Sequence, residues 1–194
     1  MQFICIMGIS GSGKSTLESS LEQMGYNRSV SYTTRKPQIR NNVLETDGNE
    51  YKFVTEEKFM QLVKADIIIE FEKYADFYYG TPAPIGAEKH VAVVCVNGFK
   101  ALKEKYGDQV IGIYLKCPEK VSIERIIERH SNSAKTSKEI EARIQNDLKL
   151  ASEMERLADL VLDARNSKER NLFEVLKYVR GKKLRVNDRK EIQV

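Results

Sequence analysis

Residues 8–15, which read GISGSGKS, constrain the fold of this chain more than any other segment. They match the G-x-x-x-x-G-K-S pattern, in which the backbone N–H groups of a glycine-rich turn surround a phosphate. A continuous apolar run at residues 3–7 precedes the turn, as is typical of a buried parallel strand. Leu17 and Leu21 follow at helical spacing and predict a helix that begins near Lys14. A strand, a glycine-rich turn and a helix in this order predict a phosphate-binding loop, or P-loop, within an α/β domain.

The predicted P-loop supplies groups that bind the phosphates of ATP. Its glycines let backbone N–H groups approach phosphate oxygens, and the start of the helix adds positive potential. Lys14 is expected to reach the β- and γ-phosphates, and the hydroxyl of Ser15 is expected to bind Mg²⁺. ATP and Mg²⁺ are therefore the predicted cofactors. The candidate ATP-binding residues are Gly8, Ser10, Gly11, Ser12, Gly13, Lys14, Ser15 and Thr16.

A P-loop by itself does not separate kinases from GTPases or motor ATPases. The chain has no N-K-x-D motif for reading guanine nucleotides and no clear D-x-x-G switch, which argues against a GTPase. At 194 residues it is also short for a motor. A small-molecule kinase is the class that remains.

Apolar strand patterns alternate with helical patterns along the rest of the chain. Strand patterns occur at residues 91–96, 110–115 and 160–162, and helical patterns occur at 140–151 and 172–179. The run at 91–96 is the most hydrophobic, so we expect it at the centre of the sheet. Alternation of this kind predicts a mainly parallel sheet with helices on both faces.

The segment from 29 to 81 breaks this alternation. It is richer in aromatic residues and in short strand patterns, at residues 29–32, 51–54 and 67–71. Thr55 is placed to cap the N-terminus of a helix after the second of these strands. We therefore predict that the segment is an inserted substrate-binding subdomain.

The composition is that of a soluble protein of one domain, with 41% hydrophobic and 31% charged residues. The net charge of +4 suits an enzyme with polyanionic substrates, or only confers solubility, and is too small to indicate nucleic-acid binding. No apolar run is long enough to predict a signal segment or a membrane span. Cys5, Cys95 and Cys117 lie in or beside apolar runs, which predicts structural thiols in a reducing compartment. The expected location is the cytoplasm.

Four elements follow the P-loop in a characteristic order. SYTTR occupies residues 31–35, DGNEYKFV occupies 47–54, Glu70 comes next, and YYGT occupies 78–81. In order, spacing and identity these elements resemble the guanylate kinase family, whose members phosphorylate GMP with ATP. The resemblance is most specific up to residue 81 and continues more loosely to about residue 180.

The resemblance implies the P-loop kinase fold. This is a three-layer α/β sandwich with a central parallel sheet, an inserted mixed β/α subdomain that binds the nucleoside monophosphate, and a helical lid. It also implies a single domain over residues 1–180, followed by a charged tail at 181–194 that we expect to fray. The implied parts are a core at 1–30 and 82–180, the monophosphate-binding subdomain at 31–81 and a lid at about 129–143.

The same resemblance assigns residues to the acceptor GMP. A dianionic phosphate needs a guanidinium and hydroxyl donors, and these are assigned to Ser31, Arg35, Tyr51 and Tyr79. Glu70 is assigned to the N1 and N2 protons of guanine, a donor pair that adenine lacks, and Thr81 is assigned to guanine O6. Taken singly, each of these residues has a more ordinary explanation, as a strand aromatic or a surface charge. Their joint order after a P-loop favours the site.

Three arginines are candidates for the transferring phosphates. Arg125 and Arg129 lie four apart on one predicted helix, and Arg143 lies on the next. The resemblance implies that they belong to a lid and act with Lys14 as catalytic residues, without a general base. The alternative is that they form salt bridges with neighbouring glutamates on the helix surface.

The chain departs from the family pattern at three points. Gln38 stands where the family carries an arginine, and Arg40 is expected to substitute for it in GMP binding. The central strand of the family ends in D-x-D before a glycine. Here Cys95 is expected at the first aspartate, near the metal, and Asn97 at the second, near the guanine, where it can still accept a hydrogen bond. Residues 162–164 read LDA where the family has an asparagine near the adenine.

Three functions are compatible with these patterns. The first is ATP-dependent phosphorylation of GMP or dGMP by in-line transfer. The second, motivated by the departures at Gln38 and Asn97, is a deoxynucleoside monophosphate kinase with broader base tolerance. The third is a catalytically silent guanylate kinase-like module that binds proteins, which the intact P-loop disfavours. The predicted partners are small-molecule nucleotides, without nucleic acid or membrane, and a homodimer is left open.

Overall fold

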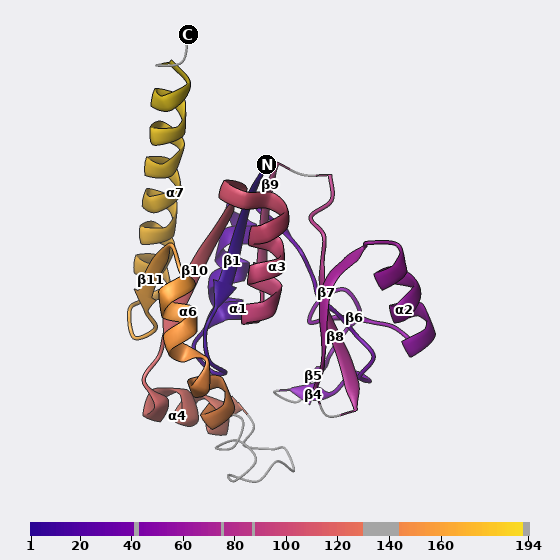
Figure 1. Ribbon diagram of the computed structural model, residues 1–194. Helices are drawn as coiled ribbons and strands as arrows, with labels where there is room; N and C mark the ends of the chain where they lie inside the picture. Colours follow the sequence, from indigo (N-terminus) through magenta and orange to yellow (C-terminus); the bar gives the residue numbers. More distant parts are fainter. Residues whose placement is uncertain (41–42, 75, 87, 130–143, 192–194) are drawn as a thin grey trace.

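The computed structural model describes residues 1–40, 43–74, 76–86, 88–129 and 144–191. A five-stranded parallel sheet forms its core, in the order β11-β10-β1-β9-β2 (Figure 1). The strands are β1 (Gln2–Met7), β2 (Asn27–Arg28), β9 (Lys89–Val93), β10 (Val110–Lys116) and β11 (Leu160–Asp163).

The strand that carries the P-loop lies at the centre of this sheet. β1 pairs with β10 on one side and with β9 on the other, and its residues 3–7 are fully buried. The apolar run at 91–96, expected at the centre, is instead one strand removed from it, and its last residue already belongs to a helix. Hydrophobicity does not tell the central strand from the strand beside it. Both have a neighbouring strand on each side and helices on both faces, so both are equally buried from water.

Helices cover both faces of the sheet. In Figure 1, α3 and α6 lie in front of the sheet and α1 lies behind it, while α7 contacts α1 and β11. This arrangement confirms the predicted α/β sandwich. The helices of the core are α1 (Lys14–Gln23), α3 (Val96–Tyr106), the 3-10 turn η1 (Gly107–Gln109), α4 (Glu119–Arg129), α6 (Ala151–Leu157) and α7 (Lys168–Glu191), and residues 144–149 are also helical.

A second, smaller sheet forms the inserted segment, in the order β6-β3-β8-β7. Its strands are β3 (Tyr32–Thr33), β6 (Lys52–Phe53), β7 (Ile68–Tyr74) and β8 (Phe77–Pro82), and it mixes parallel and antiparallel pairs. The helix α2 (Glu56–Lys64) packs on it through a small core of Phe59, Leu62 and Ile68. Two short strands, β4 (Ile39–Arg40) and β5 (Val43–Leu44), pair separately.

Local chemistry explains where the inserted elements begin. The Thr55 hydroxyl accepts a hydrogen bond from Lys58 N at 3.2 Å and caps α2, as predicted. The strand predicted at 29–32 is wrong for residues 29–31, because β2 ends at Arg28 and β3 begins at Tyr32. Residues 29–31 are therefore the connection between the core and the insert.

The last helix is longer than the sequence pattern indicates. We expected a frayed tail from residue 181, but α7 continues to Glu191 and extends past the end of the sheet (Figure 1). Among the described residues, no helix is both long enough and apolar enough to cross a membrane.

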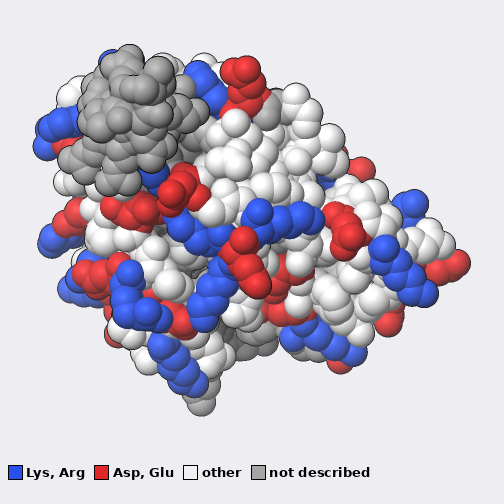
Figure 2. Space-filling view, turned by 45° about the horizontal axis from the view of Figure 1, so that its top comes forward, with Lys and Arg blue, Asp and Glu red and all other residues white. Residues whose placement is uncertain are grey.

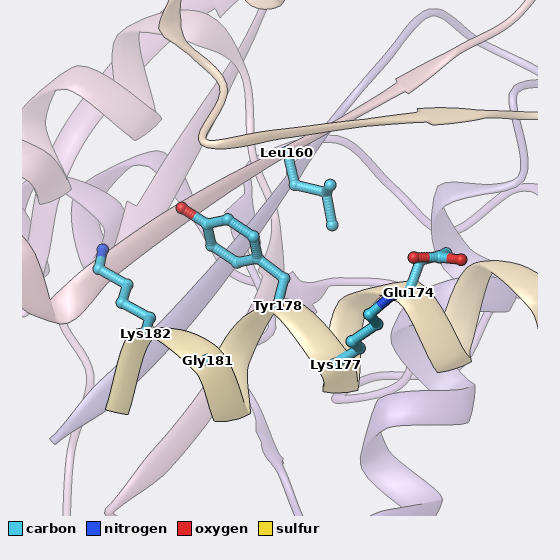
Figure 3. Close-up of a pocket in the computed structure, with 6 residues that line it drawn as sticks. All are labelled: Leu160, Glu174, Lys177, Tyr178, Gly181 and Lys182. Atoms are coloured by element: carbon cyan, nitrogen blue, oxygen red, sulfur yellow. The ribbon is translucent and has the colours of Figure 1, made fainter. Parts of the chain in front are cut away.

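A cavity of about 290 Å³ lies between α7 and β11, where Tyr178 faces Leu160 (Figure 3). It shares no residue with the P-loop or with the acceptor motifs. Its lining is completed by Glu174, Lys177, Gly181 and Lys182.

Candidate functional site

The P-loop connects β1 to α1 in a conformation that depends on its glycines. Gly13 is the N-cap of α1 with φ 95° and ψ 16°, and Gly11 has φ 76°, both in the left-handed region. A Cβ on Gly11 would lie 2.7 Å from the carbonyl oxygen of Ser122, on α4. The loop is therefore confined between the sheet and α4.

Lys14 and Ser15 occupy the first turn of α1. Lys14 Nζ donates to the carbonyl oxygens of Gly8 and Ile9, each at 2.8 Å, so its ammonium lies over the loop. Ser15 is exposed. Backbone amides, a helix N-terminus and an ammonium together make this a site for anions.

Three described side chains from outside the loop hydrogen-bond its backbone: Arg125, Asp147 and Ser122, whose hydroxyl donates to Ser10 O. Arg125 of α4 donates to Gly11 O at 3.4 Å and to Ala164 O at 2.9 Å, and thereby joins the P-loop to the segment after β11. Asp147 Oδ2 accepts a hydrogen bond from Ser10 N at 2.7 Å. The Asp147 carboxylate thus already accepts a hydrogen bond from one of the P-loop amides that we assigned to the phosphates of ATP.

The second cluster surrounds Arg35 in the inserted subdomain. Its guanidinium forms a bidentate ion pair with Glu45, with N–O distances of 2.6 and 3.1 Å. Arg35 is 7% exposed and Glu45 is 3% exposed, so the pair is buried. The guanidinium carbon lies 5.2 Å from the ring centroid of Tyr51, whose ring meets that of Tyr79 edge-on at 5.8 Å. The structure therefore gathers three of the predicted phosphate-binding residues.

A third cluster lies where the two sheets approach each other. Glu70 of β7 pairs in register with Thr81 of β8, and Thr81 Oγ1 donates to Glu70 Oε2 at 3.2 Å. Cys95, the N-cap of α3, donates through Sγ to the same oxygen at 3.8 Å. Burial raises the pKa of Glu70, whereas the hydrogen bond from Thr81 lowers it in part.

Comparisons with known proteins agree with this geometry. The guanylate kinase family model matches residues 1–179. This chain belongs to the guanylate kinase family. The guanylate kinase of Lactobacillus johnsonii is 33% identical to it over 142 residues, which are 68% of this chain and 67% of that protein. The guanylate kinase of Lactiplantibacillus plantarum is 33% identical over 157 residues, covering 76% and 74%.

A solved structure supports the fold assignment. The crystal structure of guanylate kinase from Anaplasma phagocytophilum matches 93% of this chain and 85% of its own with a TM-score of 0.65, at 19% identity. Guanylate kinases are phosphotransferases, and the reaction of the family is the phosphorylation of GMP by ATP. The family resemblance and the P-loop kinase fold are confirmed, and neither the broad-specificity alternative nor the silent binding module is favoured.

Cys95 and Asn97 lie differently at the start of α3 in this guanylate kinase family member. Asn97, predicted near the guanine, is exposed on the first turn of α3. Cys95, predicted near the metal, contacts the carboxylate of Glu70. The difference arises because the helix begins at Val96, which turns the two side chains to different sides.

The remaining predicted residues are only partly described. Ser31 precedes β3 and is half-buried, and its carbonyl oxygen accepts a hydrogen bond from Lys52 N at 2.9 Å. Arg40 and Arg129 end the backbone of β4 and α4, but their side chains lie outside the described residues. Arg143 and most of the predicted lid also lie outside them.

Sequence patterns did not identify two carboxylates that shape this site. Glu45 accepts hydrogen bonds from Arg35 and from Gln38 N, the latter at 2.9 Å, and so fixes the loop that carries the departure at residue 38. Asp147 follows Arg143 by four positions in the sequence pattern that predicts a helix at 140–151, and this spacing is the indication that the sequence offers. Neither belongs to a motif that we assigned.

Figure 2 shows one face of the molecule, on which blue and red side chains are interspersed. This face of the molecule therefore carries mixed charge.

Proposed function

We propose that this protein transfers the γ-phosphoryl group of ATP to GMP or dGMP. One observation carries the proposal: a guanylate kinase family chain holds both an intact P-loop and a separate cluster of Arg35, Tyr51 and Tyr79. A phosphoryl transfer between two nucleotides requires two anion sites on one chain. Phosphoryl transfer depends mainly on positioning and charge neutralisation, which such a pair of sites supplies.

On the donor side, the P-loop amides and Lys14 would bind the β- and γ-phosphates of ATP. The exposed hydroxyl of Ser15 suits Mg²⁺, which prefers oxygen ligands and keeps several waters. Bound Mg²⁺ would neutralise charge on the phosphates. Cys95 does not suit this ion, because burial raises the pKa of its thiol to about 12 and the neutral thiol is a poor ligand. The other Mg²⁺ ligands would then be phosphate oxygens and water.

On the acceptor side, Arg35, with Ser31, Tyr51 and Tyr79, would bind the phosphate of GMP. The guanidinium has five N–H donors, and its hydrogen bonds to Glu45 and to Lys36 O engage only part of them. Arg40 would contribute a further cation. The ion pair with Glu45 therefore orients Arg35 without consuming its capacity to bind phosphate.

The guanine would be read by Glu70. Its carboxylate can accept hydrogen bonds from the N1 and N2 protons, and a base without these donors would leave it unpaired. We assigned Thr81 to guanine O6, but its single hydroxyl proton is directed to Glu70 in this structure. Thr81 would therefore act by holding Glu70, or would turn its hydroxyl when the base enters. Asn97, exposed on α3, would at most reach the edge of the base.

Arg125, Arg129 and Arg143 would neutralise charge on the transferring phosphate. Arg125 already lies against the loop, where its position is set by Gly11 O and Ala164 O. We further propose that the lid at about 129–143 and the subdomain at 31–81 close over the core of the 1–180 domain and exclude water. A cytoplasmic location completes the proposal.

An assay of ADP release across the common nucleoside monophosphates tests the function. We expect turnover with GMP and dGMP and little with AMP, CMP or dTMP. Comparable turnover with dTMP or dCMP would remove the guanine assignment of Glu70. Lys14→Ala should abolish turnover and keep the thermal unfolding transition, whereas Lys100→Ala, on the exposed side of α3, should keep both turnover and the transition. A wild-type protein that does not bind ATP would contradict the kinase assignment.

A further inference from the structure

We propose that Cys95 is a positioning residue for base recognition, because its thiol holds the carboxylate of Glu70 in the orientation that reads guanine. The inference rests on the proposed function, since it takes Glu70 as the group that contacts the base. It concerns a side chain at which this sequence departs from its family pattern, and it gives that departure a physical role.

Three separate elements bring the cluster together. Glu70 is on β7, Thr81 is its cross-strand partner on β8, and Cys95 is the N-cap of α3. The register of β7 and β8 shifts between Ile68 and Glu70. An irregularity of this kind re-aims the side chains that follow it. The carboxylate is thus directed toward the start of α3, at the junction of the insert and the core.

Both donors act on the same carboxylate oxygen. Thr81 Oγ1 lies 3.2 Å and Cys95 Sγ lies 3.8 Å from Glu70 Oε2, and among the described residues these are the hydrogen bonds of this carboxylate. A carboxylate that is held through one oxygen has a defined plane. The carboxylate is then presented in a fixed orientation to a ligand with two adjacent N–H donors, and among the described residues no hydrogen-bond donor occupies Oε1.

Cys95 is itself held in place. Its Sγ accepts a hydrogen bond from Gly98 N at 3.3 Å, as an N-cap does. Burial and the adjacent Glu70 raise the pKa of the thiol to about 12, so the sulfur keeps its proton and can donate it to the carboxylate. The backbone at Gly98 packs closely against the cluster, because a Cβ on this residue would lie 2.5 Å from Thr81 Oγ1.

A metal site is the other reading of the same residues. One ligand atom from each of Glu70, Glu72 and Cys95 lies within 4.8 Å of the others. Mg²⁺, the ion that the proposed reaction uses, prefers oxygen ligands and is a poor partner for sulfur. Glu72 is exposed and has no role in the hydrogen bonds to Oε2. Hydrogen bonding therefore accounts for the geometry without an ion.

The test compares Cys95→Ala with Cys95→Ser, first with GMP or AMP varied at saturating ATP and then with ATP varied at saturating GMP. Loss of one hydrogen bond to a carboxylate should raise KM for GMP about threefold to tenfold in Cys95→Ala. We expect kcat to stay within about twofold, KM for ATP to stay unchanged, and the preference for GMP over AMP to fall. Cys95→Ser keeps a donor and should restore KM for GMP. Cys117→Ala, which removes a different buried thiol, should leave the GMP to AMP preference unchanged.

The possible results separate the two proposals. A wild-type protein with no GMP kinase activity would refute the proposed function itself. An active wild type with Cys95→Ala unchanged, or with Cys95→Ser as impaired as Cys95→Ala, would refute only the role of the thiol. A joint loss of kcat, ATP affinity and thermal stability in Cys95→Ala would indicate a general packing defect and would also overturn it.

Discussion

Replacement of Glu45 by glutamine tests whether a buried ion pair organises the acceptor site. Glu45 accepts hydrogen bonds from both terminal nitrogens of Arg35 and from the backbone N–H of Gln38. Glu45→Gln keeps the shape of the side chain but removes its charge, and leaves a guanidinium buried at 7% exposure without a counterion. The defect is therefore electrostatic rather than steric.

The cost can be worked from the burial of the pair. Breaking a buried ion pair by removing one partner costs about 3–5 kcal/mol, and glutamine keeps one acceptor oxygen, so we expect about 3 kcal/mol. For a chain of this length each kcal/mol shifts the unfolding midpoint by about 2–4 °C, which gives a decrease of roughly 6–12 °C. KM for GMP should rise as well, because Arg35 loses its orientation, while KM for ATP should change little.

The measurements are thermal unfolding and steady-state kinetics with each nucleotide varied in turn. Glu155→Gln is the matched control, since Glu155 pairs with Lys116 on the surface, where the two side chains are 46% and 57% exposed. The control should resemble wild type, because exposed pairs contribute little. The reasoning is refuted if Glu45→Gln has the unfolding midpoint and the KM for GMP of the wild type.

Three further outcomes follow from the described contacts. Gly11→Ala should lower stability or ATP binding by about 1–3 kcal/mol, because φ is 76° and the new Cβ would meet Ser122 O at 2.7 Å; unfolding and ATP titration check it. Asp147→Asn should lower KM for ATP about threefold or more, because the carboxylate on Ser10 N competes with phosphate; an unchanged or higher KM would contradict this. The raised pKa of Glu70 means that kcat/KM for GMP should fall with acidification at a higher pH than for an ordinary glutamate, since the protonated form accepts fewer hydrogen bonds; Glu70→Gln should flatten that acid limb of the profile.

The donor site could be predicted largely from the sequence because its groups are local. The P-loop amides, Lys14 and Ser15 lie within eight consecutive residues, and glycine spacing alone specifies how the turn can close. Even here, the sequence did not reveal Asp147, which reaches Ser10 N across 137 positions. Contacts at such separation depend on how α4 and the following helical residues pack on the loop.

The acceptor site could be predicted by residue type but not by partner. The order of Arg35, Tyr51 and Tyr79 indicated a phosphate cluster, and the structure brings these side chains together. The ion pair of Arg35 with Glu45 was not foreseen, because a carboxylate among polar loop residues has the same pattern whether it is exposed or buried. Its burial is decided by the loop that folds back over it.

By itself, the sequence determined the class of fold, the P-loop and the family to which the chain belongs, because these depend on short motifs and on periodicities of neighbouring residues. Only the tertiary structure decided that β1, rather than the more hydrophobic β9 segment, is central, and that Cys95, rather than Asn97, meets Glu70. Strand order and the residue at which a helix begins are set by contacts between distant segments. Because α3 begins at Val96, the N-cap Cys95 and the helical Asn97 point to different sides. The start of the helix therefore decides which group lies against the carboxylate that we propose reads the base.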